Sequence, residues 1–381
     1  MSYLEYTVKT IPAGPRKILY LHWPLIGLVC AVASVGLLML TSVAGGDFGR
    51  WAEPQLVRFA AGFVLMLIVA MIPIWFWRNM AVLAYGVSIL LLILTEFFGA
   101  VGMGAQRWID IGPLRLQPSE LSKITVVMLL AAYYDWLDVK KVSRPLWVLL
   151  PVLIVLLPAG LTLIQPDLGT SILIVMGGGI VMYAAGVSWW YFGVVAAAGV
   201  GLVFAVFASR GTTWQLLRDY QYRRIDTFMD PSVDPLGAGY HITQSKIALG
   251  SGGLSGRGFM QGTQSRLNFL PEKHTDFIFT TLAEEFGFIG GISLLGLYAL
   301  IIVFGLVAAM QNRDRFSSLL IIGIVGTVFL FVAVNMSMVM GLAPVKGVPL
   351  PLVSYGGSAM LVMLGAFGLI QSAHVHRPRN R

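Results

Sequence analysis

The stretch LYLHWPLIGLVCAVASVGLLMLTSV at residues 19–43 contains no Asp, Glu, Lys or Arg and is long enough to cross a lipid bilayer. It is the first of ten mainly apolar runs. The runs lie at residues 19–43, 55–77, 80–100, 119–137, 145–164, 168–187, 188–208, 277–310, 316–342 and 351–373. Hydrophobic residues make up 57% of the chain and charged residues 12%, with a mean hydropathy of +0.80, whereas soluble domains are about a quarter charged. The runs do not alternate as β-barrel strands do, so the sequence predicts an all-α polytopic membrane protein with about ten transmembrane helices.

The connections between the runs predict the topology. Lys and Arg cluster before the first run, after the second, fourth and eighth, and after the last, as in loops that face the cytoplasm. Both termini are therefore expected in the cytoplasm, with tails at residues 1–18 and 374–381. The long polar segment 208–276, between the seventh and eighth runs, is expected on the outer face. We expect residues 1–381 to form a single transmembrane domain without a cleaved signal peptide.

Composition excludes several kinds of site. Cys30 is the single cysteine, so no internal disulfide or cysteine metal site can form. The five histidines are scattered and match no HExxH spacing. The net charge of +8 would suit nucleic acid, but in a membrane protein it is better explained by cytoplasmic loops and an anionic ligand or lipid. We therefore expect contacts with membrane lipids and no nucleic-acid partner.

Two charged residues lie near the start of the fourth apolar run. Glu120 and Lys123 lie three residues apart on a helix expected to begin at Pro118 and Ser119, so they share one face of that helix. One interpretation is an internal ion pair. The other adds Asp167, from the turn QPDLGT, and places the three side chains in a water-filled cavity open to the outer side, where Lys123 would bind a substrate phosphate.

Two other outer segments contribute candidate binding residues. The run GSGGLSGRG at residues 250–258 matches neither GxGxxG nor a P-loop. It is either a flexible surface loop or an anion-binding loop whose backbone N–H groups act together with Arg257. The segment 335–358 ends at Ser358, a further candidate substrate-binding residue.

Asp276 lies where the outer segment returns to the membrane. It could cap the helix that follows, or act as a general base if its apolar surroundings raise its pKa. His274 is either a competing base or a hydrogen-bonding surface residue. In the preceding outer loop, Arg107 could hold a phosphate, and Trp108 could be a platform for a sugar ring or an anchor at the membrane interface.

Five long stretches resemble the SEDS family of bacterial cell-wall proteins, and its elongation member more closely than its division member. They are GAQRWIDIGPLRLQPSELSK at 104–123, QPDLGT at 165–170, GAGYHITQSKIALGSGGLSGRG at 237–258, GTQSRLNFLPEKHTDFIFTTLAEEFGFIG at 262–290 and NMSMVMGLAPVKGVPLPLVSYGGS at 335–358. The resemblance implies a peptidoglycan glycosyltransferase of the bacterial cytoplasmic (inner) membrane that polymerises lipid II during cell elongation. It implies that Asp276 is the essential acid, that Trp108 takes part in function, and that Glu120, Lys123 and Asp167 line a polar cavity.

The resemblance also implies partners. The chain lacks the SxxK and KTG motifs of a transpeptidase, so cross-linking is expected from a class B penicillin-binding protein, alongside other proteins of the elongation complex. Its docking surface is expected near residues 316–342, where Gly323 and Gly326 would permit close approach of a helix. A divalent cation, Mg²⁺ or Mn²⁺, is a possible cofactor.

The chemistry of the expected reaction suits these residues. Breaking a sugar–pyrophosphate bond develops negative charge that Arg and Lys stabilise, and the acceptor hydroxyl needs a base, for which Asp276 is the best candidate. One dominant acid favours inversion by direct attack over the paired carboxylates of a retaining mechanism. Two alternatives remain open: a lipid II flippase and a non-catalytic scaffold of the elongation complex.

Overall fold

The computed structural model describes residues 14–102, 105–111, 114–217, 219–230, 238–267, 269, 272–344 and 347–377. In these ranges the chain is mainly helical, with one small antiparallel sheet of order β1-β2-β3. The elements are η1 (Gly14–Tyr20), α1 (Trp23–Val43), α2 (Ala52–Met71), α3 (Ile74–Phe98), β1 (Ala100–Gly102), β2 (Ala105–Ile111), β3 (Leu114–Leu116), α4 (Pro118–Trp136), η2 (Val139–Lys141), α5 (Pro145–Ile164), α6 (Leu168–Ala185), α7 (Trp189–Ala208), α8 (Asp219–Met229), α9 (Ala238–Ser251), α10 (Thr263–Arg266), α11 (Ile278–Gln311), α12 (Arg315–Val339) and α13 (Gly357–Val375).

Within the described ranges, nine helices are long and apolar enough to cross a membrane: α1, α2, α3, α5, α6, α7, α11, α12 and α13. Helix α4 has 19 residues and carries Glu120 and Lys123, yet it packs beside α3, α6 and α12. Pro118 is its first residue, as predicted, because the missing N–H of proline costs nothing at that position. With α4 included, the helices match the ten predicted runs, and the all-α polytopic fold is confirmed.

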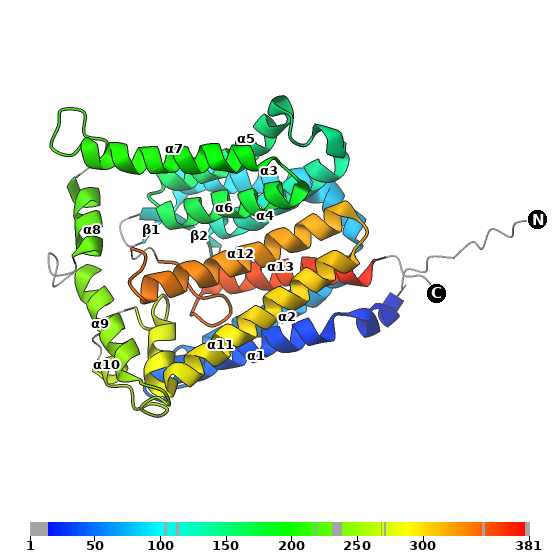
Figure 1. The fold of residues 1–381 in the computed structure, drawn as a ribbon. Helices are drawn as coiled ribbons and strands as arrows, with labels where there is room; N and C mark the ends of the chain where they lie inside the picture. The colour runs from blue at the N-terminus through cyan, green and yellow to red at the C-terminus, as the bar shows by residue number, and fades with distance from the viewer. Residues whose placement is uncertain are drawn as a thin grey trace, which may run out of the picture.

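The long helices lie side by side in one bundle (Figure 1). Helix α12 contacts α4, α6, α11 and α13, whereas no residue of α7 is buried within the chain. Helix α1 begins and α13 ends at one end of the bundle, and α8, α9, α10 and the strands lie at the other end (Figure 1). This agrees with the predicted separation of the segment 208–276 from both termini. Parts of the predicted tails 1–18 and 374–381 lie outside the described residues.

The connection between the second and third helices differs from the prediction. The apolar runs placed it near Arg78, but α2 ends at Met71 and α3 begins at Ile74. Pro73 is the N-cap of α3, and a proline inside a helix would remove a backbone hydrogen bond. Arg78 lies instead in the first turns of α3, where its Nη1 is 3.1 Å from Asp135 Oδ2.

The end of the bundle that carries α8, α9 and α10 has more secondary structure than the sequence predicted. The segment 208–276, expected as one long loop, contains α8, α9 and α10. Helix α9 packs against α11 and α12, so this segment covers the end of the bundle. The prediction sought only helices apolar enough for a membrane, and α8, DYQYRRIDTFM, is too polar to meet that test.

The glycine-rich run is part of a backbone junction with α11. Helix α11 is interrupted at Gly287, whose φ of 67° and ψ of −162° suit only glycine. The N–H groups of Arg257 and Gly258 donate to the carbonyl oxygens of Glu284 and Glu285 at 3.0 and 2.9 Å, and the N–H of Phe288 donates to Gly253 at 2.9 Å. The N–H groups of Arg257 and Gly258 are therefore already bonded to α11. The glycine-rich run is held by that helix and is not a free surface loop.

The two glycines proposed for partner docking face the interior. A Cβ atom on Gly323 would lie 2.4 Å from Val127 Cγ1 of α4, and one on Gly326 would lie 2.9 Å from Ile180 of α6. Both glycines allow α12 to approach its own neighbours closely, so the prediction that they form a docking surface was wrong. Every face of an apolar helix looks alike in sequence, and packing alone decides which face is covered.

Candidate functional site

Asp276 lies two residues before α11, whose first turn lies at the end of the bundle that carries α9 and α10 (Figure 1). Its carbonyl oxygen accepts a hydrogen bond from Asn335 Nδ2 of α12 at 2.9 Å, and the same nitrogen donates to the carbonyl of Val348 at 2.7 Å. A Cβ atom on Gly347, whose φ is +62°, would be 3.4 Å from Asp276 Oδ2. Helix α12 therefore holds the backbone at Asp276, and the segment after α12 passes close to the carboxyl group.

Helix capping does not explain Asp276. The N-cap of α11 is Phe277, and no side chain caps that helix. Instead, the pKa of the half-buried Asp276 carboxyl group is raised to about 7. Burial is the larger cause, and the nearby charge of Glu272 is the smaller one. A carboxyl group that titrates near neutral pH is suited to accept a proton from a hydroxyl group.

His274 belongs to an aromatic cluster beside this site. Its ring stacks on Trp51, with centroids 4.3 Å apart, and Trp51 meets Tyr355 edge-on at 4.8 Å. The guanidinium of Arg58 lies over the Tyr355 ring at 4.6 Å. Burial lowers the pKa of His274, which keeps the imidazole neutral. Its stacked position makes it a wall of the site.

A pocket of about 400 Å³ opens next to this cluster. It lies between the turn after α1 and the segment that contains α10. It is lined by Ser42, Val43, Ala44, Gly45, Arg50, Trp51, Ser265, Arg266, Lys273 and His274. Of these residues, only His274 was predicted from the sequence to belong to a site. Arg50 and Trp51 are far from residues 265–274 along the chain, so their proximity could not be read from the sequence. Lys273, next to His274 in the PEKHTD stretch, was the one further signal that pointed here.

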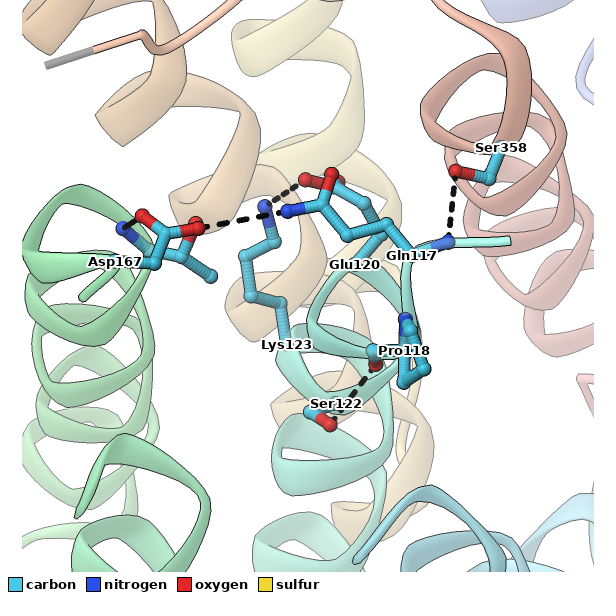
Figure 2. Close-up of polar contacts among 8 residues, drawn as sticks. Gln117, Pro118, Glu120, Ser122, Lys123, Asp167 and Ser358 are labelled. Carbon is cyan, nitrogen blue, oxygen red and sulfur yellow. Dashed lines mark hydrogen bonds and ion pairs between the residues drawn. The ribbon is translucent and has the colours of Figure 1, made fainter. Parts of the chain in front are cut away.

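Glu120 and Lys123 form the internal ion pair that was one of the two interpretations. Lys123 Nζ is 2.7 Å from Glu120 Oε1, and both residues are buried, with 4% and 7% of their surfaces exposed (Figure 2). Lys123 Nζ also lies 4.1 Å from the centroid of the Phe331 ring. Glu120 lines a pocket of about 20 Å³, which has room for roughly one water molecule.

Asp167 joins this region through Gln117. It caps α6, where Oδ1 accepts the backbone N–H of Thr170 at 3.1 Å and Oδ2 accepts its hydroxyl at 2.9 Å. Gln117 Nε2 lies 3.5 Å from Asp167 Oδ2, and the Gln117 backbone N–H donates to Ser358 Oγ at 3.2 Å. Figure 2 shows Gln117 between Asp167 on one side and Ser358 on the other, with Glu120 and Lys123 beside it. The structure thus brings together four predicted residues and adds Gln117.

The remaining predicted residues lie elsewhere. Arg107 donates from Nε and Nη2 to the carbonyl oxygens of Gln165 and Pro166 at 3.2 and 2.5 Å, so it holds the turn before α6. Trp108 is half-buried in β2, opposite Ala100 of β1. Arg257 donates to the Thr263 hydroxyl at 2.8 Å. Their roles in substrate binding stay predictions.

A divalent cation held by the protein alone would need several oxygen or nitrogen ligands, whereas Mg²⁺ is often held by one or two carboxylates together with substrate phosphates. Across the residues that the structure describes, no group of three or more His, Cys, Asp or Glu side chains could hold one. The described residues therefore do not fit a cation site formed by the protein, and we derive no step through a metal.

The fold and site define a polytopic membrane protein. At one end of its bundle lie a carboxyl group with a pKa of about 7 and a pocket lined by Arg and Lys side chains. The chain belongs to the FtsW/RodA/SpoVE family of cell cycle proteins, whose family model matches residues 17–379. It is 43% identical to the peptidoglycan glycosyltransferase MrdB of Escherichia coli K12 over 353 residues. The aligned region covers 92% of each chain.

Solved structures show the same relationship. A chain of a peptidoglycan synthase complex, solved to show how polymerization and crosslinking are coordinated, superposes with a TM-score of 0.80 at 30% identity and covers 93% of this chain and 97% of that one. The rod shape determining protein RodA of Thermus thermophilus superposes with a TM-score of 0.71 at 28% identity and covers 94% and 98%.

Proposed function

We propose that this chain is a peptidoglycan glycosyltransferase that polymerises lipid II during cell elongation, with Asp276 as the general base on the acceptor sugar. The observation that carries the assignment of the base is the half-buried Asp276 carboxyl group, whose backbone is held by Asn335 and whose pKa is raised to about 7. The family and the relatives named peptidoglycan glycosyltransferases support the reaction class.

The reaction follows from this arrangement. Asp276 accepts the proton of the acceptor hydroxyl group as its oxygen attacks the anomeric carbon of the donor sugar. The bond from that carbon to the lipid diphosphate breaks, and its electron pair leaves with the diphosphate, which therefore gains negative charge. Direct attack with Asp276 as the base, without a covalent intermediate, inverts the configuration at that carbon.

The pH dependence of polymerisation should report Asp276. The base is active when ionised, so the rate should fall about tenfold per pH unit below its pKa of about 7 and level off above it. Glu272→Gln should move this fall to lower pH, because removing the Glu272 charge lowers the pKa of Asp276. Measuring initial rates from pH 5 to 9 tests both statements, and a profile that Glu272→Gln leaves in place would contradict the assignment.

The chain is proposed to lie in the bacterial inner membrane with both termini in the cytoplasm and Asp276 outside. In a Cys30→Ser background, a cysteine at the exposed Ser255 should react with a membrane-impermeant thiol reagent in intact cells. A cysteine at the exposed Lys140, in η2 between α4 and α5, should react only after the cells are opened. The opposite labelling pattern would place the site in the cytoplasm.

A class B penicillin-binding protein is the proposed partner, in line with the similarity to a chain of a synthase complex that couples polymerization and crosslinking. We expect such a transpeptidase to co-purify with this chain and to raise its rate of lipid II polymerisation. Gel analysis of glycan strands made by the chain alone and by the pair measures this. Full activity of the isolated chain, with no co-purifying transpeptidase, would argue against an obligate partner. A flippase or a scaffold would form no polymer in either sample.

A further inference from the structure

We propose that Gln55 of α2 is a positioning residue for Asp276 and that it acts through the chain between α12 and α13. We call residues 347–356 of that connection the return segment. The proposal rests on the proposed function, because it names what holds the base of that reaction in place. Gln55 acts through the backbone and is not proposed to touch substrate.

The return segment is bonded to the backbone that leads into Asp276. The carbonyl oxygen of His274 accepts a hydrogen bond from the N–H of Tyr355 at 2.9 Å, and that of Thr275 accepts one from the hydroxyl of Ser354 at 2.6 Å. The carbonyl oxygen of Asp276 is bonded to α12. Three consecutive carbonyl groups are thus held from one side, so the position of the return segment decides the position of this backbone.

Gln55 ties the return segment to α2. Its Nε2 donates to the carbonyl oxygen of Ser354 at 3.0 Å, and its Oε1 accepts the N–H of Gly356 at 3.3 Å. The two bonds flank Tyr355, the residue that donates to His274. Only 1% of Gln55 is exposed, so removing its amide leaves a backbone donor and a backbone acceptor unsatisfied. The segment must then shift to satisfy them.

The earlier part of the return segment is strained and tightly packed. Leu352 has a φ of +65°, in the left-handed region, and such a conformation persists only when its surroundings hold it. A Cβ atom on Gly36 of α1 would lie 2.7 Å from Val353 Cα, so backbone meets backbone there. The hydroxyl of Tyr298 in α11 donates to the carbonyl of Pro351. Helices α1 and α11 therefore hold the middle of the segment, and α2 holds its last residues.

Asp276 should respond to a shift of this backbone in two ways. A base must lie within hydrogen-bond reach of its substrate, and a small misplacement can lower the rate by about 100-fold. Its carboxyl group is half-buried, and burial is the larger cause of its raised pKa of about 7. A displaced return segment admits water and lowers that pKa. Loss of Gln55 should therefore change both the rate and its pH dependence.

Gln371 of α13 provides a matched control. It is also 1% exposed, its Oε1 accepts the N–H of His22 at 2.8 Å, and its Nε2 donates to the His22 carbonyl at 3.4 Å. Like Gln55, it pairs one backbone donor and one backbone acceptor. His22 is the N-cap of α1, at the end of the bundle opposite α9 and α10 (Figure 1). The two glutamines therefore differ in which segment they hold.

The test measures initial rates of lipid II polymerisation by the purified, folded chain from pH 5 to 9 and over a range of lipid II concentrations. Gln55→Leu should lower kcat about 10- to 100-fold, change KM less than about twofold, and move the fall in rate to lower pH. Gln371→Leu should lose similar thermal stability and keep both kcat and the pH profile. Hydrogen exchange at residues 354–356 should be faster in Gln55→Leu than in Gln371→Leu.

Ser354→Ala is a second variant that leaves α2 unchanged. It removes the hydrogen bond to the Thr275 carbonyl, so it should also lower kcat and shift the pH profile. Adding it to Gln55→Leu should lower the rate by less than it does alone, because both residues act through one connection. If Gln55→Leu does not fold, an unchanged rate and pH profile in Ser354→Ala would overturn the inference.

With both glutamine variants folded, three results would overturn the inference. They are an equal rate and pH profile in Gln55→Leu and Gln371→Leu, equal hydrogen exchange at residues 354–356, and fully multiplicative effects in the double variant. Failure of the proposed function would look different. The unaltered chain would then make no polymer, or Asp276→Asn would still polymerise lipid II, while hydrogen exchange would still distinguish the two glutamine variants.

Discussion

Asp276→Asn is expected to lower the rate of lipid II polymerisation by about 10²–10⁴-fold, the usual contribution of a general base, and so to leave no detectable polymer. Asn keeps the size of the side chain but cannot accept the proton. The backbone contacts of Asp276 with Asn335 do not involve the carboxyl group, so insertion and abundance should be nearly unchanged. The measurement is a gel of labelled glycan strands made by the purified variant.

Stability gives an independent readout for the same substitution. Burial raises the pKa of Asp276 to about 7 in the folded chain, above the value of 3.8 for a free Asp side chain, so ionising it disfavours the folded state as pH rises from about 4 to 7. Asp276→Asn should therefore raise the midpoint of thermal unfolding at pH 8 and have little effect at pH 4. The control is Glu272→Gln, which keeps the Asp276 carboxyl group and should still polymerise lipid II. Substantial polymer from the Asn variant would remove Asp276 from the role of base.

Lys123→Met is expected to destabilise the protein by about 3–5 kcal/mol, because it leaves the buried Glu120 carboxyl without its cation. Polymerisation should fall with it. Lys123→Arg should rescue poorly, since a planar guanidinium does not fit a site closed by Glu120 and the Phe331 ring. Denaturation of the purified variants, with their activity measured in parallel, checks both statements.

The double variant Glu120→Gln with Lys123→Met supplies the control. Replacing both members of a buried pair costs much less than removing one, so most of the lost stability should return. If the stable double variant remains inactive, Lys123 also contacts substrate, as the sequence analysis predicted. If single and double variants are equally unstable, the ion pair does not hold α4 in place.

The sequence by itself determined the membrane architecture and several residues of the site. Each apolar run became a long helix, and the predicted runs 145–164 and 316–342 lie within a few residues of α5 and α12. This succeeds because a bilayer selects length and hydrophobicity, which are local properties of the chain. The spacing of Glu120 and Lys123 was local too, so their pairing followed from helix geometry.

Tertiary structure alone decided which of these residues meet and what each contact does. The stacking of Trp51 on His274, and the pocket that Arg50 shares with Arg266, join parts of the chain that are far apart in sequence. The docking of the glycine-rich run into the break of α11 at Gly287 is likewise a contact between distant segments. The inward direction of Gly323 was undetermined because an apolar helix gives no local sign of which face its neighbours will cover. Contacts of this kind depend on how helices pack, and packing is a property of the whole chain.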